Sequence, residues 1–144
     1  MKDNVTDLVV QVSRIISTSQ EKVFNAWLDP AMLSTFMLPK TGMPNPEVTI
    51  DPVVGGEYEI IMDVGDQKIP HHGKYLMIDP HHKIEFSWNS PFSGEGSVVS
   101  IEFREVDVSH TEVNLVHRKF PSEESRDNHE AGWTSILEML ANQV

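Results

Sequence analysis

The residues best suited to chemistry in this 144-residue chain are histidines, and His117 is the leading candidate. It follows Val113 and Leu115 at alternating positions, so an extended strand would point all three side chains to one apolar face. A histidine there could bond to a ligand carbonyl or hydroxyl, or move a proton, because its unperturbed pKa is ~6.5. The alternative, which the pattern favours, is a buried histidine bonded to a neighbouring strand or to the C-terminal helix. Both interpretations stay open.

The histidine pairs His71-His72 and His81-His82 raise the question of a metal site. Neighbouring residues of a strand point to opposite faces, so one pair cannot converge on a single ion. Neither spacing matches a zinc-ligand pattern, and the second pair falls in a turn. The chain has no cysteine, which excludes disulfides, thiol nucleophiles and cysteine-ligated metals. We therefore predict no metal site.

No other group of residues indicates catalysis. Glu59, Glu85 and Glu102 have the parity of the outer, solvated strand faces, and they form no acid–base pair. No serine lies in a strained elbow of the kind that activates a nucleophile. The glycines of Gly94-Glu95-Gly96 are too closely spaced to cradle a phosphate. We predict neither catalytic residues nor a cofactor.

The charge of the chain argues against polyanionic partners. Its formal net charge is −11, from 22 acidic and 11 basic side chains, and the basic residues are scattered. Such a surface repels nucleic acids and anionic membranes. The N-terminus has neither the pattern of a signal peptide nor that of a membrane span. We therefore expect a soluble cytoplasmic protein, either a monomer or a weak dimer.

The periodicity of the apolar residues predicts the elements that position these side chains. Leu8 to Ile16 alternates as a partly buried strand does. Thr18 and Glu21 then form a capping-box pattern, with Thr18 as the predicted N-cap of a helix. Asp29-Pro30 ends this helix and can begin a second one. The apolar residues of the two short helices are Val23, Phe24, Ala26, Trp27, Met32, Leu33, Phe36 and Met37.

A loop over Pro39–Pro46 precedes a succession of predicted antiparallel strands with one apolar face. They cover Glu47–Asp51, Glu57–Val64, Ile69–Ile78, Lys83–Asn89, Val99–Arg104 and Glu112–Arg118. Within Ile69–Ile78, Tyr75 and Met77 are expected to share a face opposite Lys74. The turns and loops between the later strands are Gly65-Asp66, Asp79–His82, Asn89–Gly96 and Asp107–His110.

The chain closes with a long predicted helix. Ser122 is its expected N-cap, and Glu123 and Glu124 in the first turn suit the helix dipole. Its apolar stripe consists of Trp133, Ile136, Leu137 and Leu140. No other element is long enough to cover the apolar face of the sheet. We predict one α+β domain over residues 1–144, with a curved antiparallel sheet of about six to seven strands wrapped on the C-terminal helix.

Motifs in this order resemble the START-related helix-grip (SRPBCC) superfamily. Within it, the chain is similar to the single-domain homologues of the heat-shock-protein-90 ATPase activator, from Val9 onward. The motifs are Glu21-Lys22-Val23-Phe24 with Trp27 and Asp29-Pro30, Gly55-Gly56-Glu57-Tyr58, Gly73-Lys74-Tyr75 leading to Asp79-Pro80, Ile84-Glu85-Phe86-Ser87-Trp88, Val113-Asn114-Leu115-Val116-His117, and Gly132-Trp133 with Leu137 and Leu140. The resemblance is to that co-chaperone's C-terminal domain, and these residues carry no match to its N-terminal domain.

The resemblance implies an apolar cavity between sheet and helix, and hence non-catalytic binding of a small hydrophobic or aromatic molecule. Its expected walls are Tyr58, Ile60, Met62, Tyr75, Phe86, Trp88, Ile101, Phe103, Leu115 and His117, with Trp133, Ile136, Leu137 and Leu140 from the helix and Phe36 or Met37 at an entrance. A filled core needs the same residue types, so this alternative stays open. Two other functions are carried forward. One is an interaction module that acts on a chaperone in the stress response. The other is a cyclase- or hydrolase-like enzyme that uses His117 with Tyr58 or Tyr75.

Overall fold

The computed structural model describes residues 8–38, 42–91, 94–120 and 122–144. These residues form a strand, two short helices, six further strands and a long C-terminal helix, which is the predicted α+β architecture. The elements are β1 (Val9–Ile16), α1 (Gln20–Ala26), α2 (Pro30–Phe36), β2 (Glu47–Ile50), β3 (Glu57–Asp63), β4 (Lys68–Asp79), β5 (Lys83–Ser90), β6 (Gly94–Asp107), β7 (His110–Arg118) and α3 (Glu123–Gln143).

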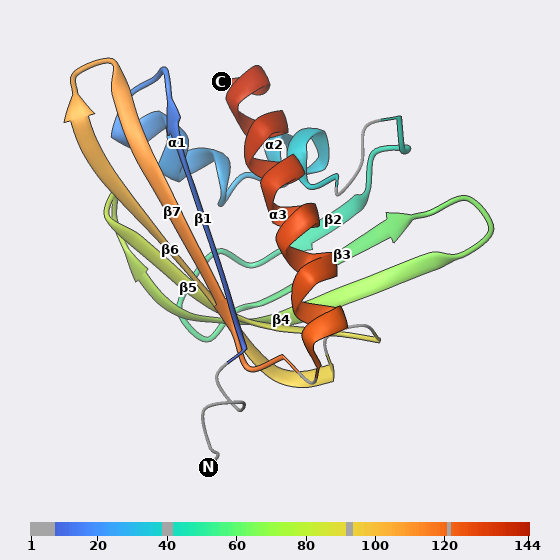
Figure 1. The fold of residues 1–144 in the computed structure, drawn as a ribbon. Coiled ribbons are helices and arrows are strands. Elements are labelled where there is room, and N and C mark those ends of the chain that lie inside the picture. The colour runs from blue at the N-terminus through green and yellow to red at the C-terminus, as the bar shows by residue number, and fades with distance from the viewer. Residues whose placement is uncertain (1–7, 39–41, 92–93, 121) are drawn as a thin grey trace, which may run out of the picture.

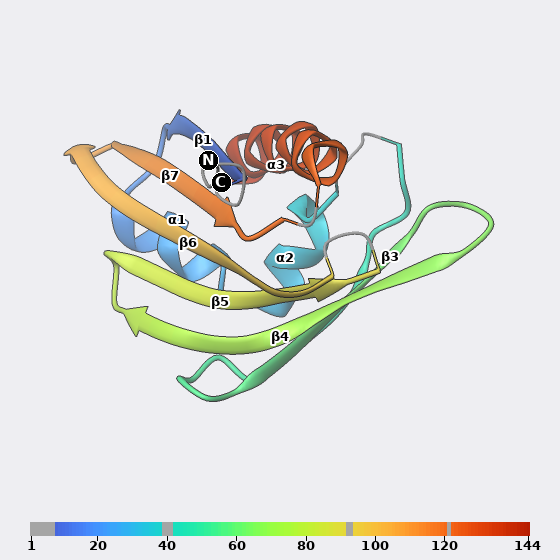
Figure 2. The ribbon, with the colours of Figure 1, turned by 60° about the horizontal axis from the view of Figure 1, so that its bottom comes forward.

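The strands form one antiparallel sheet in the order β1-β7-β6-β5-β4-β3-β2. From β2 to β7, each strand pairs with the next one along the chain, while β1 joins β7 at the opposite edge. Figure 1 shows α3 lying across the concave side of this sheet, with the β3–β4 hairpin extending past the helix. Figure 2 shows that all three helices lie on the concave side. The apolar core is therefore held between the helices and the inner face of the sheet.

The two short helices begin at capped residues, as expected, but the first cap is one residue later than predicted. The N-cap of α1 is Ser19, whose Oγ accepts a hydrogen bond from the backbone N–H of Lys22, so the assignment to Thr18 was wrong. Thr18 instead stays with the end of β1, where its carbonyl accepts a bond from the hydroxyl of Thr111 on β7. The α2 prediction is confirmed, with Asp29 as N-cap and Pro30 in the first turn.

The long helix begins where predicted. The hydroxyl of Ser122 accepts a bond from the N–H of Ser125, which satisfies one of the free backbone donors of the first turn. The predicted apolar stripe is buried: Trp133, Ile136, Leu137 and Leu140 are each at most 3% exposed. Among the described residues, no helix is both long and apolar enough to cross a membrane.

One face assignment on β4 was wrong because the strand contains a bulge. The register with β5 shifts between Tyr75 and Met77, so one extra residue is inserted on β4. A bulge of this kind reverses the alternation of faces beyond it. Tyr75 is buried at 4% exposed, whereas Met77 is 41% exposed, and the two side chains do not share the inner face.

Most described residues of the predicted loop over Asn89–Gly96 belong to strands, while residues 92 and 93 of this prediction lie outside the described residues. β5 continues to Ser90 and β6 begins at Gly94, with these two residues paired across the ladder. The composition of the segment suggested a loop because it is rich in glycine, proline and serine. Pairing to the neighbouring strand outweighs that local preference, and Gly96 takes a positive φ of 92° near the irregular register.

Candidate functional site

A groove of about 720 Å³ lies between the N-terminal half of α3 and the adjoining parts of β3, β4 and β5. It is open to solvent, since side chains such as Glu124 and Asn128 at its rim are exposed. Its walls combine apolar side chains from the sheet with a mixed surface from the helix. The lining residues are Met62, Val64, Ile69, His71, Trp88, Pro91, Ser122, Glu124, Ser125, Asn128, His129, Gly132, Trp133 and Ile136.

The apolar wall of the groove is built from both layers of the fold. Met62 and Trp88 come from the inner face of the sheet, and Trp133 and Ile136 from the buried stripe of α3. The rings of Trp88 and Trp133 lie with their centroids 5.0 Å apart. These four residues belong to the predicted cavity walls, and the structure brings them together at this groove. Their role in binding a ligand stays a prediction.

Two histidines line the groove, one from the sheet and one from α3. The sequence analysis did not assign either of them to a pocket. His71 lies on the inner face of β4, where its Nδ1 is 3.4 Å from the carbonyl oxygen of Ile60. His129 lies on α3, where its Nδ1 is 2.8 Å from the carbonyl oxygen of Ser125. The sequence spacing contained a signal that places both histidines on the inner side of their elements. His71 has the parity of Ile69 and Tyr75, and His129 is one helical turn before Trp133.

Burial keeps both of these imidazoles neutral near pH 7. It lowers the pKa of His71 to about 4, and the nearby charge of His129 acts in the same direction. Burial also lowers the pKa of His129, although its hydrogen bond to the Ser125 carbonyl opposes the shift. The neighbour His72 is exposed on the opposite face of the strand. As expected, then, the pair His71-His72 does not converge.

His117 is fully buried and takes part in a series of hydrogen bonds that runs from Trp133 to the backbone of Trp88. The indole N–H of Trp133 donates to its Nδ1 at 3.0 Å, so the ring proton must lie on Nε2. Nε2 in turn donates to the Ser97 hydroxyl at 3.0 Å, and that hydroxyl donates to the backbone carbonyl of Trp88. Burial lowers the pKa of His117 to about 2, which keeps the ring neutral. Of the two interpretations of His117, this geometry favours the buried histidine bonded to a neighbouring strand and to the C-terminal helix.

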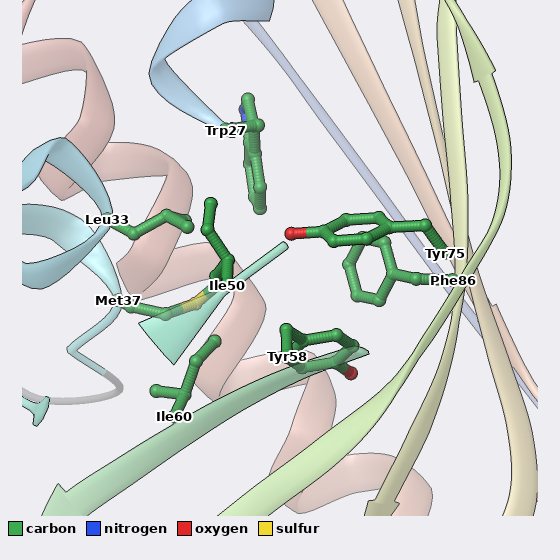
Figure 3. Close-up of a pocket in the computed structure, with 8 residues that line it drawn as sticks. All are labelled: Trp27, Leu33, Met37, Ile50, Tyr58, Ile60, Tyr75 and Phe86. Carbon is green, nitrogen blue, oxygen red and sulfur yellow. The ribbon is translucent and has the colours of Figure 1, made fainter. Parts of the chain in front are cut away.

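A second, much smaller cavity of about 10 Å³ lies at the other end of the core. This volume is at the lower limit for one water molecule. Figure 3 shows its walls, in which the Tyr75 hydroxyl points toward Trp27 while the Tyr58 hydroxyl points away from the centre. The Tyr58 hydroxyl donates to the carbonyl of Ser87. The full lining is Trp27, Leu33, Met37, Ile50, Tyr58, Ile60, Tyr75 and Phe86.

The hydroxyls of Tyr58 and Tyr75, which line the small cavity, stay protonated near pH 7. Burial raises the pKa of Tyr75 to about 12, and burial together with the neighbouring Tyr75 raises the pKa of Tyr58 well above its ordinary value. In the described part of the chain, neither phenol makes a hydrogen bond or ring contact with His117, whose two ring nitrogens are already bonded. The three residues of the enzyme hypothesis therefore form no acid–base pair in this structure.

The remaining predicted wall residues fill the core. Phe103 illustrates this, since it packs edge-on against Phe24 of α1 with ring centroids 5.5 Å apart. Each of these side chains is at most 3% exposed and lines neither cavity: Phe36, Ile101, Phe103, Leu115, Leu137 and Leu140. Met37, Ile60, Tyr58, Tyr75 and Phe86 surround only the small cavity.

The acidic side chains at outer-face parity are not paired for catalysis. Glu59 and Glu102 are exposed, as predicted, while Glu85 is half-buried and accepts a hydrogen bond from the hydroxyl of Ser100 at 2.6 Å. Within the described part of the chain, no three histidine, aspartate or glutamate side chains converge as metal ligands would.

Comparison with known proteins identifies the family. The sequence profile of the family described as Activator of Hsp90 ATPase homolog 1-like protein matches residues 17–144. The chain belongs to this family. The match begins just after β1 and takes in α1, α2, the remaining strands and α3, so it includes α3, β3, β4 and β5, which form the groove.

Solved structures confirm the fold of this Activator of Hsp90 ATPase homolog 1-like chain. Protein CV1439 from Chromobacterium violaceum is 23% identical, with a TM-score of 0.79, over 94% of this chain and 96% of that one. Protein SA2116 from Staphylococcus aureus, described as of unknown function, is 18% identical, with a TM-score of 0.74 and coverages of 96% and 95%. PFC0360w from Plasmodium falciparum, described as an HSP90 activator, is 24% identical, with a TM-score of 0.71 and coverages of 90% and 91%. No curated protein matches the sequence.

Proposed function

We propose that the protein binds a small hydrophobic or aromatic molecule, without catalysis, in the groove between the sheet and α3. The observation that carries this proposal is the groove itself. Its volume of about 720 Å³ lies within the range of roughly 300–1,000 Å³ typical of ligand pockets, whereas the second cavity holds no more than a water molecule. We therefore expect the ligand to bind between the sheet and the N-terminal half of α3, where the groove lies.

The composition of the walls supports an apolar ligand with few polar contacts. Met62, Trp88, Trp133 and Ile136 present an apolar and aromatic surface, and the ring of Trp88 is 5.0 Å from that of Trp133. Ligand pockets are typically lined in this way, with a small number of polar groups that fix orientation. In this groove the buried His71 and the half-buried His129 are polar groups that could do so.

The groove can be filled by a substitution on α3 at a residue outside its buried apolar stripe. Gly132 lines the groove and is half-buried, whereas its neighbour Ala131 is exposed and does not line it. Both lie well inside the helix, where leucine is a favourable residue. The leucine side chain of Gly132→Leu should therefore occupy the groove. Ala131→Leu is the matched control, because it places the same side chain on the exposed neighbour.

The probe for this test is Nile red, a neutral apolar dye whose fluorescence rises in an apolar site. The wild type and Ala131→Leu should bind it alike, and Gly132→Leu should weaken binding by about tenfold or more, since the leucine excludes the dye from the groove. Urea melts of the three proteins check that all are folded. Equal binding by all three, or no binding by the wild type, would reject the groove as the ligand site.

A second candidate function is interaction with a chaperone. It is supported by membership of the family described as Activator of Hsp90 ATPase homolog 1-like protein, and by the fold shared with the HSP90 activator of Plasmodium falciparum. Capture of heat-shock protein 90 by the immobilised protein from host lysate, with no effect of Gly132→Leu, would favour this function over ligand binding.

A further inference from the structure

The partners of His71 and His129 determine which ring nitrogen each histidine offers to the groove. A backbone carbonyl can only accept a hydrogen bond, so Nδ1 carries the proton in both rings when it bonds to Ile60 or Ser125. In a neutral imidazole the other nitrogen is then an acceptor. The backbone of Ile69 also contributes a hydrogen bond to the His71 ring, and no hydrogen bond between described residues involves Nε2 of either histidine. Both walls of the groove thus carry an unused hydrogen-bond acceptor.

A residue that lines the same groove, Trp88, carries an unused donor. Trp88 is only 2% exposed, and its indole N–H has no hydrogen-bond partner in the part of the chain that the structure describes. The centroid of the Trp88 ring lies 5.0 Å from that of His71, so the residues that carry the donor and one acceptor are neighbours in the wall of the groove. A buried donor without a partner is costly, which favours any ligand that supplies an acceptor there.

The charges around the groove disfavour an anionic ligand. Its described lining residues include the carboxylate of Glu124 but neither lysine nor arginine. The whole chain carries a formal net charge of −11. His71 is neutral near pH 7 because burial lowers its pKa to about 4, so it offers no positive charge to a carboxylate or phosphate. The groove is therefore better suited to a neutral ligand than to an anionic one, and its histidines can recognise such a ligand by neutral hydrogen bonds.

A hydroxyl is the neutral group that fits both kinds of unused partner, because one O–H donates a bond and accepts another. We propose that the ligand is a neutral alcohol or phenol with an apolar body, its hydroxyl held between Nε2 of His71 and the indole N–H of Trp88. His129 offers a second acceptor from the opposite wall. This inference rests on the proposed function, since it specifies the ligand of the same groove.

The test compares three aromatic probes of similar size, with affinities measured by isothermal titration calorimetry at pH 7.5. 1-Naphthol has a hydroxyl, 1-methoxynaphthalene has the donor blocked, and 1-naphthoate carries a negative charge. We expect 1-naphthol to bind about three- to tenfold more tightly than 1-methoxynaphthalene, the contribution of one net hydrogen bond. We expect 1-naphthoate to bind most weakly.

The contribution of His71 is tested by His71→Phe, which keeps a ring against Trp88 and removes the acceptor. The variant should bind 1-methoxynaphthalene as the wild type does and should lose the preference for 1-naphthol. His72→Phe is the matched control, because this neighbour is exposed on the outer face and should retain the preference. If His71→Phe does not fold, His129→Phe serves as the second variant. It should reduce the preference for 1-naphthol in part.

The outcomes separate the two proposals. Equal binding of 1-naphthol and 1-methoxynaphthalene by the wild type would overturn the hydroxyl assignment and leave ligand binding in place. Tightest binding of 1-naphthoate would overturn it as well. A preference that survives unchanged in both folded variants would overturn the role of the histidines. Failure of all three probes and of Nile red to bind would overturn the proposed function, and the hydroxyl assignment with it.

Discussion

At the scale of single residues, His117 shows how a histidine at the centre of a core can be structural. Its ring links α3 to the sheet, because it accepts a bond from Trp133 on one side and donates to Ser97 on the other. The Ser97 hydroxyl passes the chain on to the carbonyl of Trp88. Every donor in this series of hydrogen bonds has an acceptor, so the His117 imidazole is buried without an unsatisfied atom.

We predict that His117→Leu lowers the free energy of unfolding by about 2–4 kcal/mol, because the Trp133 N–H is left without an acceptor and Ser97 loses a donor. His117→Gln should cost less, since its amide can both accept and donate. Urea denaturation at pH 7.5 measures both. Equal losses in the two variants would show that packing of the ring, rather than the hydrogen bonds, accounts for the effect.

The sequence predicted the direction of the His117 side chain but not its partners. Alternation with Val113 and Leu115 was sufficient to place it on the inner face. Ser97 was not identified because the segment before it resembled a loop, and only pairing with β5 brings its hydroxyl to the carbonyl of Trp88. The positions of His71 and His129 at the groove were missed for a related reason: the groove forms from contacts between elements distant in the sequence.

At the scale of elements, α3 covers the concave face of the sheet and is anchored by Trp133. This residue is 2% exposed, and its ring packs 5.0 Å from that of Trp88. We predict that Trp133→Ala lowers the free energy of unfolding by about 3–5 kcal/mol, the usual loss for truncating a large aromatic side chain in a core. The exposed neighbour Thr134 is the control, and Thr134→Ala should change stability by no more than about 0.5 kcal/mol. A loss below about 1 kcal/mol for Trp133→Ala, measured in urea, would contradict the role of α3 as the cover of the core.

The bulge in β4 leads to a prediction that a regular strand would not. Met77 is 41% exposed because the register shifts after Tyr75. Met77→Lys should therefore change the free energy of unfolding by no more than about 0.5 kcal/mol in a urea melt. In a regularly pleated strand the lysine would enter the core and cost several times as much, so a large loss would argue against the bulge. Period-two alternation cannot reveal an inserted residue, which is why the sequence misplaced this side chain.

At the scale of the whole molecule, the sequence predicted the architecture but not the distribution of empty space. Apolar alternation and helix caps were enough for the seven-stranded sheet and its long helix, because these are local patterns. Whether an apolar side chain lines a groove or fills a core depends on the curvature of the sheet and the place where the helix crosses it. Met62 therefore lines the groove, whereas Leu115 is buried in the core, although both have the same inner parity.

The buried histidines also make the stability of the whole molecule depend on pH. Burial lowers the pKa of His117 to about 2 and that of His71 to about 4, whereas an unfolded histidine titrates near ~6.5. Below pH ~6.5 the unfolded chain therefore binds protons that the folded chain does not, and stability falls as the pH falls. The loss approaches about 1.4 kcal/mol per pH unit for each group, until the pH reaches its folded-state pKa.

From pH 7.5 to pH 5.5, these two histidines should together lower the free energy of unfolding by about 2–3 kcal/mol. Urea denaturation across this range at constant ionic strength measures the change. His117→Gln removes one of these two titrating groups and should reduce their joint contribution to the pH dependence by about half. The control is His72→Gln, since this side chain is exposed and should leave the pH dependence as it is. A free energy of unfolding that stays constant from pH 7.5 to pH 5.5 would mean that protons reach both imidazoles in the folded protein, contrary to their burial behind α3.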